Sequence, residues 1–192
     1  MNISSSKIIR FAKHAYKTAS QVLPEYSSKY SRKDYTQWQH VALLCIKERT
    51  KQKWEEFPDL LANLPYVCEI LGLEQVPHFT TLNKFFLRMK NNIFLVMILT
   101  TSGRASGLAS ADATGFDRRH SSKHYVKRCK ILIKSMKTTL LIDTQEQKIS
   151  GVHCTTSRKH DTQILLPLVK KTGRRIRVLC ADKGYDDKDI RD

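Results

Sequence analysis

The chain has 192 residues, 41% of them hydrophobic and 27% charged, a composition typical of a globular protein with one or two small domains. Since 34 Lys and Arg residues outnumber 18 Asp and Glu residues, the formal net charge is +16, which favours nucleic acid as a partner and leaves a merely basic or ribosome-associated protein as the alternative. Five cysteines without a C-x-x-C pair argue against a disulfide framework or a zinc ribbon, and the longest apolar run, 93–99, is too short to cross a bilayer, so we expect a cytoplasmic protein with no membrane partner.

The first hundred residues are expected to be helical. Residues 1–30 show no sustained period and are predicted to form a mobile arm or a short irregular helix. Ser31 and Asp34 resemble a capping box, behind which apolar residues in 38–48 follow the spacing of a helix of about four turns. A second helical region, 59–72, contains a proline that is expected to divide it into two short pieces.

A third helix is predicted from a cap at Thr80 or Thr81. Its apolar stripe, expected to be core, consists of Leu82, Phe85, Phe86 and Met89. Lys84 and Arg88 fall on the polar face of this helix, where they are candidates for contact with DNA. These short helices are compatible with a helix-turn-helix that reads the major groove, or with a small helical bundle that does not.

Beyond the small-residue linker 101–107 the hydrophobic period shifts from 3.6 towards 2, so we place a domain boundary between residues 102 and 103. The predicted elements are strands at 108–113, 137–143 and 149–155, a helix from Asp161 to about Gly173, and a strand at 175–181. This order is a three-stranded meander, a crossover helix and a strand parallel to one already present. A right-handed crossover would place the last strand beside the first.

Two of the apolar runs each end in an aspartate beside a turn. LASADATGFDRR (108–119) contains Asp112, and VLCADKGYDD (178–187) contains Asp182. A carboxylate that closes a buried strand is held at low dielectric, which suits a hard divalent cation or a general base. For either aspartate alone, the alternative is an ordinary strand-end residue that caps a turn.

The predicted topology makes the two aspartates neighbours in space. Two facing carboxylates repel unless a cation lies between them, and oxygen ligands favour Mg²⁺ or Mn²⁺. A pair of such ions about 4 Å apart activates an attacking water or 3′-hydroxyl and stabilises the leaving oxygen in an in-line attack on phosphate. The residues expected to contact DNA around this site, rather than to form a solvated charged loop, are Arg118, Arg119, His124, Tyr125, Lys127, Arg128 and Lys183.

Several short motifs resemble the transposases of bacterial and archaeal insertion sequences. They are D-x-T-G-F at 112–116, the His-Tyr pair and arginine in 124–128, A-D-K-G-Y-D at 181–186, and L-G-L-x-x-V-P-H-F-T-T-L at 71–82. The resemblance covers roughly residues 35–190. It implies an α/β, RNase H-like catalytic domain with a mixed sheet, preceded by an all-α region that binds the transposon ends.

In that family the first two members of an Asp-Asp-Glu triad follow the first and fourth strands, which implies that Asp112 and Asp182 are ligands of two Mg²⁺ or Mn²⁺ ions. The third member is a glutamate well downstream of the second aspartate, and residue 192 is reached before it, so the sheet is expected to be incomplete at its C-terminal end. A decayed remnant, a first reading frame completed by a second product, and a truncated gene model all remain open.

The resemblance implies a transposase that cleaves and joins DNA at the ends of an insertion sequence, as a homodimer on terminal inverted repeats and target DNA in the nucleoid. Two alternatives remain. One is a non-catalytic DNA-binding remnant of a transposase, and the other is a structure-selective nuclease on the same fold, such as a junction resolvase.

Overall fold

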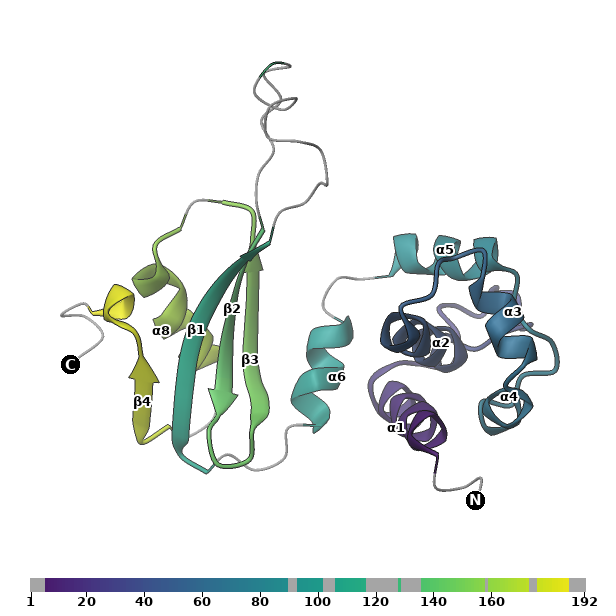
Figure 1. The fold of residues 1–192 in the computed structure, drawn as a ribbon, viewed down its shortest axis with the longest axis horizontal. Helices are drawn as coiled ribbons and strands as arrows, with labels where there is room; N and C mark the ends of the chain where they lie inside the picture. The colour runs from purple at the N-terminus through teal and green to yellow at the C-terminus, as the bar shows by residue number, and fades with distance from the viewer. Residues whose placement is uncertain are drawn as a thin grey trace. The chain divides into compact units, whose positions relative to one another are not determined.

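The computed structural model describes residues 6–89, 93–101, 106–116, 128, 136–157, 159–172 and 176–186. The chain divides into two compact units, Met1–Thr100 and Thr101–Asp192. The first unit is helical and the second contains a four-stranded sheet (Figure 1). None of the described helices is both long enough and apolar enough to span a bilayer.

The helices of the first unit are short. They are α1 (Lys7–Val22), α2 (Gln37–Thr50), α3 (Phe57–Ala62), α4 (Pro65–Ile70), α5 (Phe79–Arg88) and α6 (Ile93–Thr101). The predicted interruption at Pro65 is confirmed, because α3 ends three residues earlier and the proline occupies the first position of α4, where its missing N–H leaves no hydrogen bond unmade.

The prediction of a mobile arm or short irregular helix over residues 1–30 is wrong for most of its length. Residues 7–22 form a regular 16-residue helix, α1. Ile9, Ala12, Ala15 and Ala19 are buried on one face of it, and α1 packs against α2. Three of these four residues are alanines, which let two helices approach closely but give a weak hydrophobic signal in the sequence.

Helix α2 begins later than expected. Its capping box is formed by Thr36, whose hydroxyl accepts from the Gln39 amide at 3.1 Å, and by Gln39, whose Oε1 accepts from the Thr36 amide at 2.7 Å. The box predicted at 31–34 is therefore wrong. The Gln39 side chain also donates to the carbonyl oxygens of Leu71 (3.0 Å) and Gly72 (2.8 Å), which ties the start of α2 to the end of α4.

The start of α5 and one member of its stripe also differ from expectation. The N-cap is His78, whose Nδ1 accepts from the Thr80 amide at 3.4 Å, so neither Thr80 nor Thr81 caps the helix. Phe85 is buried, as predicted, whereas Phe86 is 45% exposed and is not a core residue. The apolar stripe of α5 is therefore narrower than the 3.6-residue period suggested.

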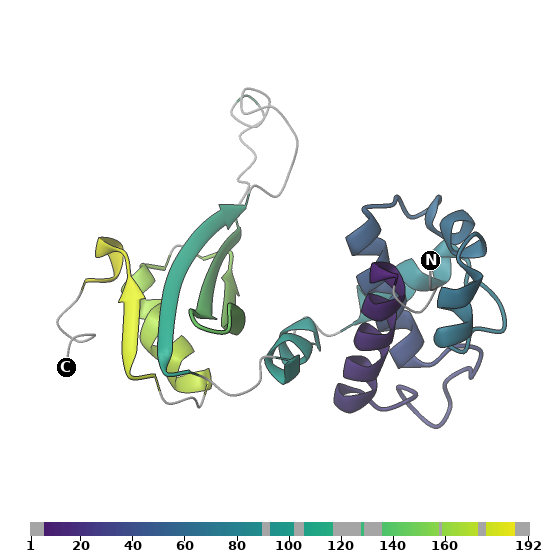
Figure 2. The same ribbon diagram turned by 60° about the horizontal axis from the view of Figure 1, so that its bottom comes forward.

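The second unit follows the predicted order of elements. It contains β1 (Leu108–Phe116), β2 (Met136–Asp143), β3 (Lys148–Thr155), α8 (Asp161–Thr172), β4 (Val178–Ala181) and the 3₁₀ turn η2 (Lys183–Tyr185). The strand order is β3-β2-β1-β4, with β1 antiparallel to β2 and parallel to β4 (Figures 1 and 2). This confirms the meander, the crossover helix and the parallel fourth strand of an α/β, RNase H-like domain.

One face of this sheet is covered by α8 (Figure 2). The core between them consists of Ala109, Ala111, Leu141, Leu165, Leu168 and Tyr185. Alternate residues of a strand point to opposite faces, so the buried alanines of β1 fix which residues face α8 and which face away. Asp112, between two inward-facing alanines, faces away from α8.

Another aspartate, Asp143, is the last residue of β2 and has a structural role. It is 2% exposed. Its carboxylate accepts from the Ser106 amide (2.6 Å) and hydroxyl (2.8 Å) and from the amides of Gln145 (3.1 Å) and Glu146 (3.0 Å). The backbone hydrogen bond from Glu146, followed by that from Ser106, lowers the pKa of Asp143 to about 2. Asp143 therefore holds the β2–β3 turn against the segment that enters β1.

Replacing Asp143 with Asn is expected to lower the thermal unfolding temperature of the second unit at neutral pH. It should also make this temperature depend less on pH below about 4. Because the folded-state pKa of about 2 lies below the ordinary value of 3.8, the stabilisation from Asp143 is present above pH 3.8 and is lost as pH falls towards 2. Thermal unfolding followed over this pH range tests the expectation. The expectation would be contradicted if the unfolding temperature of the Asn variant fell with decreasing pH as steeply as that of the unsubstituted protein.

Candidate functional site

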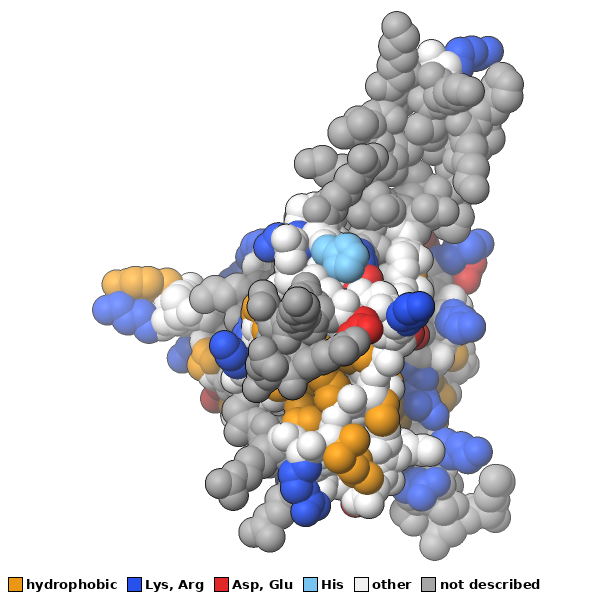
Figure 3. Space-filling view, turned by 90° about the vertical axis from the view of Figure 1, so that its left-hand side faces the viewer, with side chains coloured by type: hydrophobic (Ala, Val, Ile, Leu, Met, Phe, Trp, Pro, Cys, Tyr) orange, Lys and Arg blue, Asp and Glu red, His pale blue; other side chains and the backbone are white. Residues whose placement is uncertain are grey.

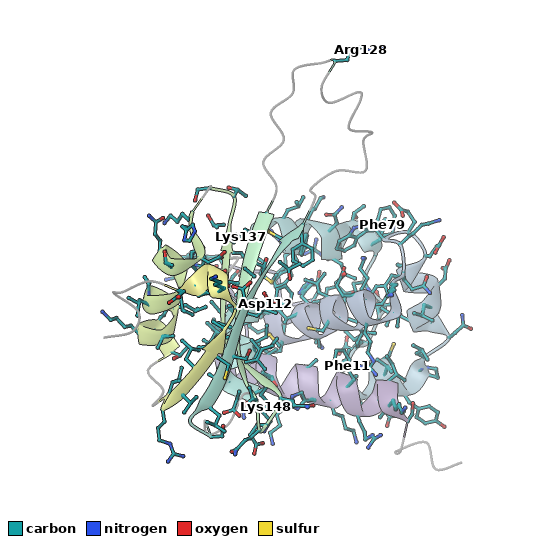
Figure 4. The ribbon with its side chains drawn as sticks, turned by 60° about the vertical axis from the view of Figure 1, so that its left-hand side comes forward. Phe11, Phe79, Asp112, Arg128, Lys137 and Lys148 are labelled. Carbon is teal, nitrogen blue, oxygen red and sulfur yellow. The ribbon has the colours of Figure 1, made fainter. Side chains whose placement is uncertain are left out.

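The pairing of β1 with β4 brings the two predicted site aspartates together. The strands are in parallel register, with Ala111 opposite Ala181, so Asp112 is the next residue on β1 and Asp182 is the residue that directly follows β4. Asp112 lies within β1, which continues to Phe116, so the expectation that the first strand closes at this aspartate is wrong (Figure 4). Asp182 is the first residue after β4 and the N-cap of η2. Two residues that are 70 positions apart in the sequence (182 − 112) are thus neighbours in the sheet, as the predicted crossover requires.

Both carboxylates are exposed, which corrects the expectation that they are held at low dielectric. Asp112 Oδ1 accepts from the Ala113 amide at 2.7 Å, and Asp182 Oδ1 accepts from the Gly184 amide at 2.8 Å. The Oδ2 atom of each accepts no hydrogen bond from the residues that the structure describes. Each aspartate is therefore held by one local backbone bond and presents a second oxygen to solvent or to a ligand.

A buried tyrosine lies beside the aspartate pair. Tyr185 is 4% exposed, and its hydroxyl has no hydrogen-bond partner among the described residues. Burial, together with the negative charges of Asp161, Asp112 and Asp182, raises the pKa of Tyr185 to about 12. The phenol thus stays protonated and places a hydroxyl close to three carboxylates.

The third of these carboxylates, Asp161, belongs to an ion pair. Lys137 Nζ, on β2, lies 2.5 Å from Asp161 Oδ1, in the first turn of α8, and both side chains are more than half buried. Figure 3 shows acidic side chains near the middle of the face of this unit that includes β4, and Figure 4 marks the positions of Lys137 and Asp112. The pair neutralises one negative charge near the site and fixes the start of α8 to the sheet.

The donor set of the site fits a hard cation. Carboxylate oxygens are the ligands that Mg²⁺ and Mn²⁺ prefer, and the aspartate pair offers two that make no bond to the described protein. Among the described residues, no group of three or more His, Cys, Asp or Glu side chains is placed to hold a metal ion. Within the described part of the second unit, Asp112 and Asp182 are the two carboxylates that the pairing of β1 with β4 places at neighbouring positions.

The predicted DNA contacts are placed only in part. Arg118, Arg119, His124, Tyr125 and Lys127 lie outside the described residues. Arg128 is exposed (Figure 4), and Lys183 is exposed in η2 directly after Asp182. In the other unit, Lys84 and Arg88 are both exposed on α5, where Arg88 Nε donates to the Lys84 carbonyl at 3.1 Å.

The sequence did not predict that Tyr185 is buried beside the site, nor that Asp161 and Lys137 are its neighbours. A signal for Tyr185 was present, because it is the one aromatic residue in the polar segment DKGYDD. No comparable signal exists for Asp161 and Lys137, since their proximity depends on how α8 packs against β2.

A comparison with protein-family models matches the second unit of the chain. Residues 104–192 match the family model described as the transposase DDE domain. No match was found among curated proteins. The matched segment contains β1, β4 and both site aspartates. Residues 104–192 are therefore similar to the transposase DDE domain family.

Proposed function

We propose that the protein is a DNA transposase that cleaves and joins DNA at the ends of an insertion sequence, with Asp112 and Asp182 as metal ligands. The observation that carries the proposal is the register of β1 and β4, which places these two aspartates side by side within the segment that matches the family. An isolated strand-end aspartate has an ordinary structural explanation, as Asp143 demonstrates. Two exposed aspartates at adjacent positions, each with an oxygen that the described protein does not use, are better explained by a shared cation.

The chemistry assigned to each residue follows from this arrangement. A bound pair of Mg²⁺ or Mn²⁺ ions supplies charge neutralisation and activation of the attacking oxygen during phosphoryl transfer. Asp112 and Asp182 hold the cations through their free oxygens. To Lys183, which is exposed and directly follows Asp182, we assign a contact with a phosphate of the scissile strand. The Tyr185 hydroxyl, protonated at neutral pH, can donate a hydrogen bond to a ligand at the site.

The proposed partner is double-stranded DNA, namely the terminal inverted repeats of the element and its target. The net charge of +16 supports this, since a strongly basic protein attracts a phosphate polymer at long range. We assign end binding to the helical region, residues 1–102, with Lys84 and Arg88 of α5 as contacts, and catalysis to residues 103–192. Cleavage and joining of two paired transposon ends implies at least two protomers, and we propose a homodimer on DNA.

The direct test is cleavage by the protein expressed from its complete coding sequence. A duplex carrying the inverted repeats that flank the gene should be nicked at its ends in Mg²⁺ or Mn²⁺ and left intact in excess chelator. Binding without nicking under either metal would replace the proposal with the DNA-binding remnant. Preferential cutting of a four-way junction over the inverted repeats would replace it with a structure-selective nuclease.

A further inference from the structure

We propose that α1, with Arg49 of α2, forms a second surface for the phosphate backbone of duplex DNA. The inference deepens the proposed function and rests on it, because it requires the protein to bind DNA. The exposed basic face of α1, which we call the α1 stripe, consists of Lys7, Arg10, Lys13, His14 and Lys17. None of these residues was singled out by the sequence motifs.

The α1 stripe is a continuous band on one side of the helix. At 100° per residue its five side chains fall within about a third of the helix circumference. The opposite side is occupied by Ile9, Ala12, Ala15 and Ala19, which are buried. Helix α1 contains no acidic residue. Its solvent-facing side therefore bears positive charge along its whole first three turns.

Arg49, near the end of α2, extends this surface onto a second helix. Its guanidinium group lies 4.6 Å from the centre of the Phe11 ring of α1, a cation–π contact that fixes the position of an exposed charge. Phe11 lies one turn from Lys7 and from His14, so the guanidinium group is beside the α1 stripe. A charge held in place costs less side-chain entropy when it binds an anion.

These side chains are not neutralised by acidic groups of the described protein. Neither the α1 stripe nor Arg49 forms an ion pair with a described residue, whereas Arg32 pairs with Asp34 at 2.8 Å and Lys53 pairs with Glu56 at 3.3 Å. Concentrated unpaired charge repels itself, which favours a polyanion as its partner.

The length of the α1 stripe suits a nucleic-acid backbone. Lys7 to Lys17 spans about 15 Å along the helix axis. Duplex DNA carries a negative charge about every 1.7 Å of its axis, so a surface of this length can reach several phosphates. Such contacts carry no sequence information and would position the protein on DNA rather than select a site.

An anionic membrane fits this surface less well. A basic helix that lies on a bilayer inserts its apolar face among the lipids. In α1 that face is packed against α2 and forms part of the core of the first unit. Only the charged side chains of α1 could therefore contact a membrane, because its apolar face is buried in the first unit.

The test compares two variants that lose the same charge from the same unit. The stripe variant carries Arg10→Gln, Lys13→Gln and Lys17→Gln, and the control variant carries Lys29→Gln, Arg32→Gln and Lys33→Gln in the exposed segment between α1 and α2. Each removes three positive charges. Binding to a fluorescein-labelled duplex of random sequence is followed by anisotropy over a range of salt concentrations, with anionic lipid vesicles as a parallel probe and thermal unfolding as the check of folding.

The stripe variant is expected to bind DNA at least tenfold more weakly at low salt, with the slope of log K against log[salt] reduced by about 2 to 3, and the control variant to stay close to the unsubstituted protein. Gln is a good helix former, so the unfolding temperature should not change. Equal effects of the two variants, or vesicle binding that depends on the stripe while DNA binding does not, would overturn the inference and leave the proposed function intact. Failure of the unsubstituted protein to bind DNA would overturn both.

Discussion

Replacing Asp112 with Asn is expected to reduce the rate of metal-dependent nicking at the element's ends by more than about 100-fold, and Asp182→Asn to do the same. Loss of a group that only orients a metal ligand costs about 10- to 100-fold, so loss of a ligand itself should exceed this. Asn retains the shape of Asp and one oxygen but has no negative charge, which removes the electrostatic part of cation binding. Both aspartates are exposed, so folding should be little affected. Nicking rates measured as a function of Mg²⁺ and Mn²⁺ concentration test this.

Glu146→Gln is the matched control for these substitutions. Glu146 is an exposed acidic residue of the same unit, in the turn after β2, where it pairs with Lys148 at 3.0 Å. Its loss should leave the nicking rate within about twofold of the unsubstituted protein, because an exposed surface pair contributes little. Nicking retained by either aspartate variant would rule out the assignment of that residue as a metal ligand.

The second large effect expected is on stability. Leu43→Ala and Leu141→Ala should each lower the free energy of unfolding of one unit by about 2 to 5 kcal/mol. Both side chains are fully buried, Leu43 in a core between α1, α2 and the short helices and Leu141 in the core between the sheet and α8. Since the two cores share no residue, the two substitutions should act on different transitions.

Differential scanning calorimetry of the two variants separates these effects. Leu43→Ala should move one transition downward and Leu141→Ala the other. Leu87→Ala is the control, because Leu87 is 76% exposed and its loss should change stability by less than about 0.5 kcal/mol. A single transition that both core substitutions lower equally would show that the units unfold together, contrary to the separate cores described above.

The topology of the second unit could be predicted from sequence because its strands are marked by alternating or apolar runs with clear turns between them. The crossover then required β4 to lie beside β1, and the observed register adds the detail that Asp112 and Asp182 occupy adjacent positions. The register itself was not predictable, since a shift of β4 by two residues would leave each of its side chains on the same face of the sheet.

The errors have physical causes of two kinds. Helix α1 was missed because its buried face is mostly alanine, and alanine contributes packing rather than hydrophobic contrast. The cap of α2 was misplaced because Ser31 satisfies the same pattern as Thr36, and only the fold decides which residue meets a free amide.

Three aspartates of the second unit illustrate the limit for site prediction. Asp112, Asp143 and Asp182 have similar sequence contexts, a short apolar run followed by a turn. In the structure Asp143 accepts four hydrogen bonds and is buried, whereas the other two each accept one and are exposed. The low-dielectric environment that was expected for the two site aspartates is found at Asp143 instead. Hydrogen-bond partners separate the structural aspartate from the two that are available to a ligand.

The most direct test of the proposed metal site is Fe²⁺-directed cleavage of the polypeptide. Fe²⁺ replaces Mg²⁺ or Mn²⁺ at oxygen-rich sites, and with ascorbate and peroxide it generates radicals that cut the nearby backbone. Fragments ending near Asp112 and near Asp182, suppressed by excess Mg²⁺ and absent from both Asn variants, are the expected result. Cleavage confined to other parts of the chain, or fragments at these positions that persist in the Asn variants, would contradict the assignment of the two aspartates as a shared metal site.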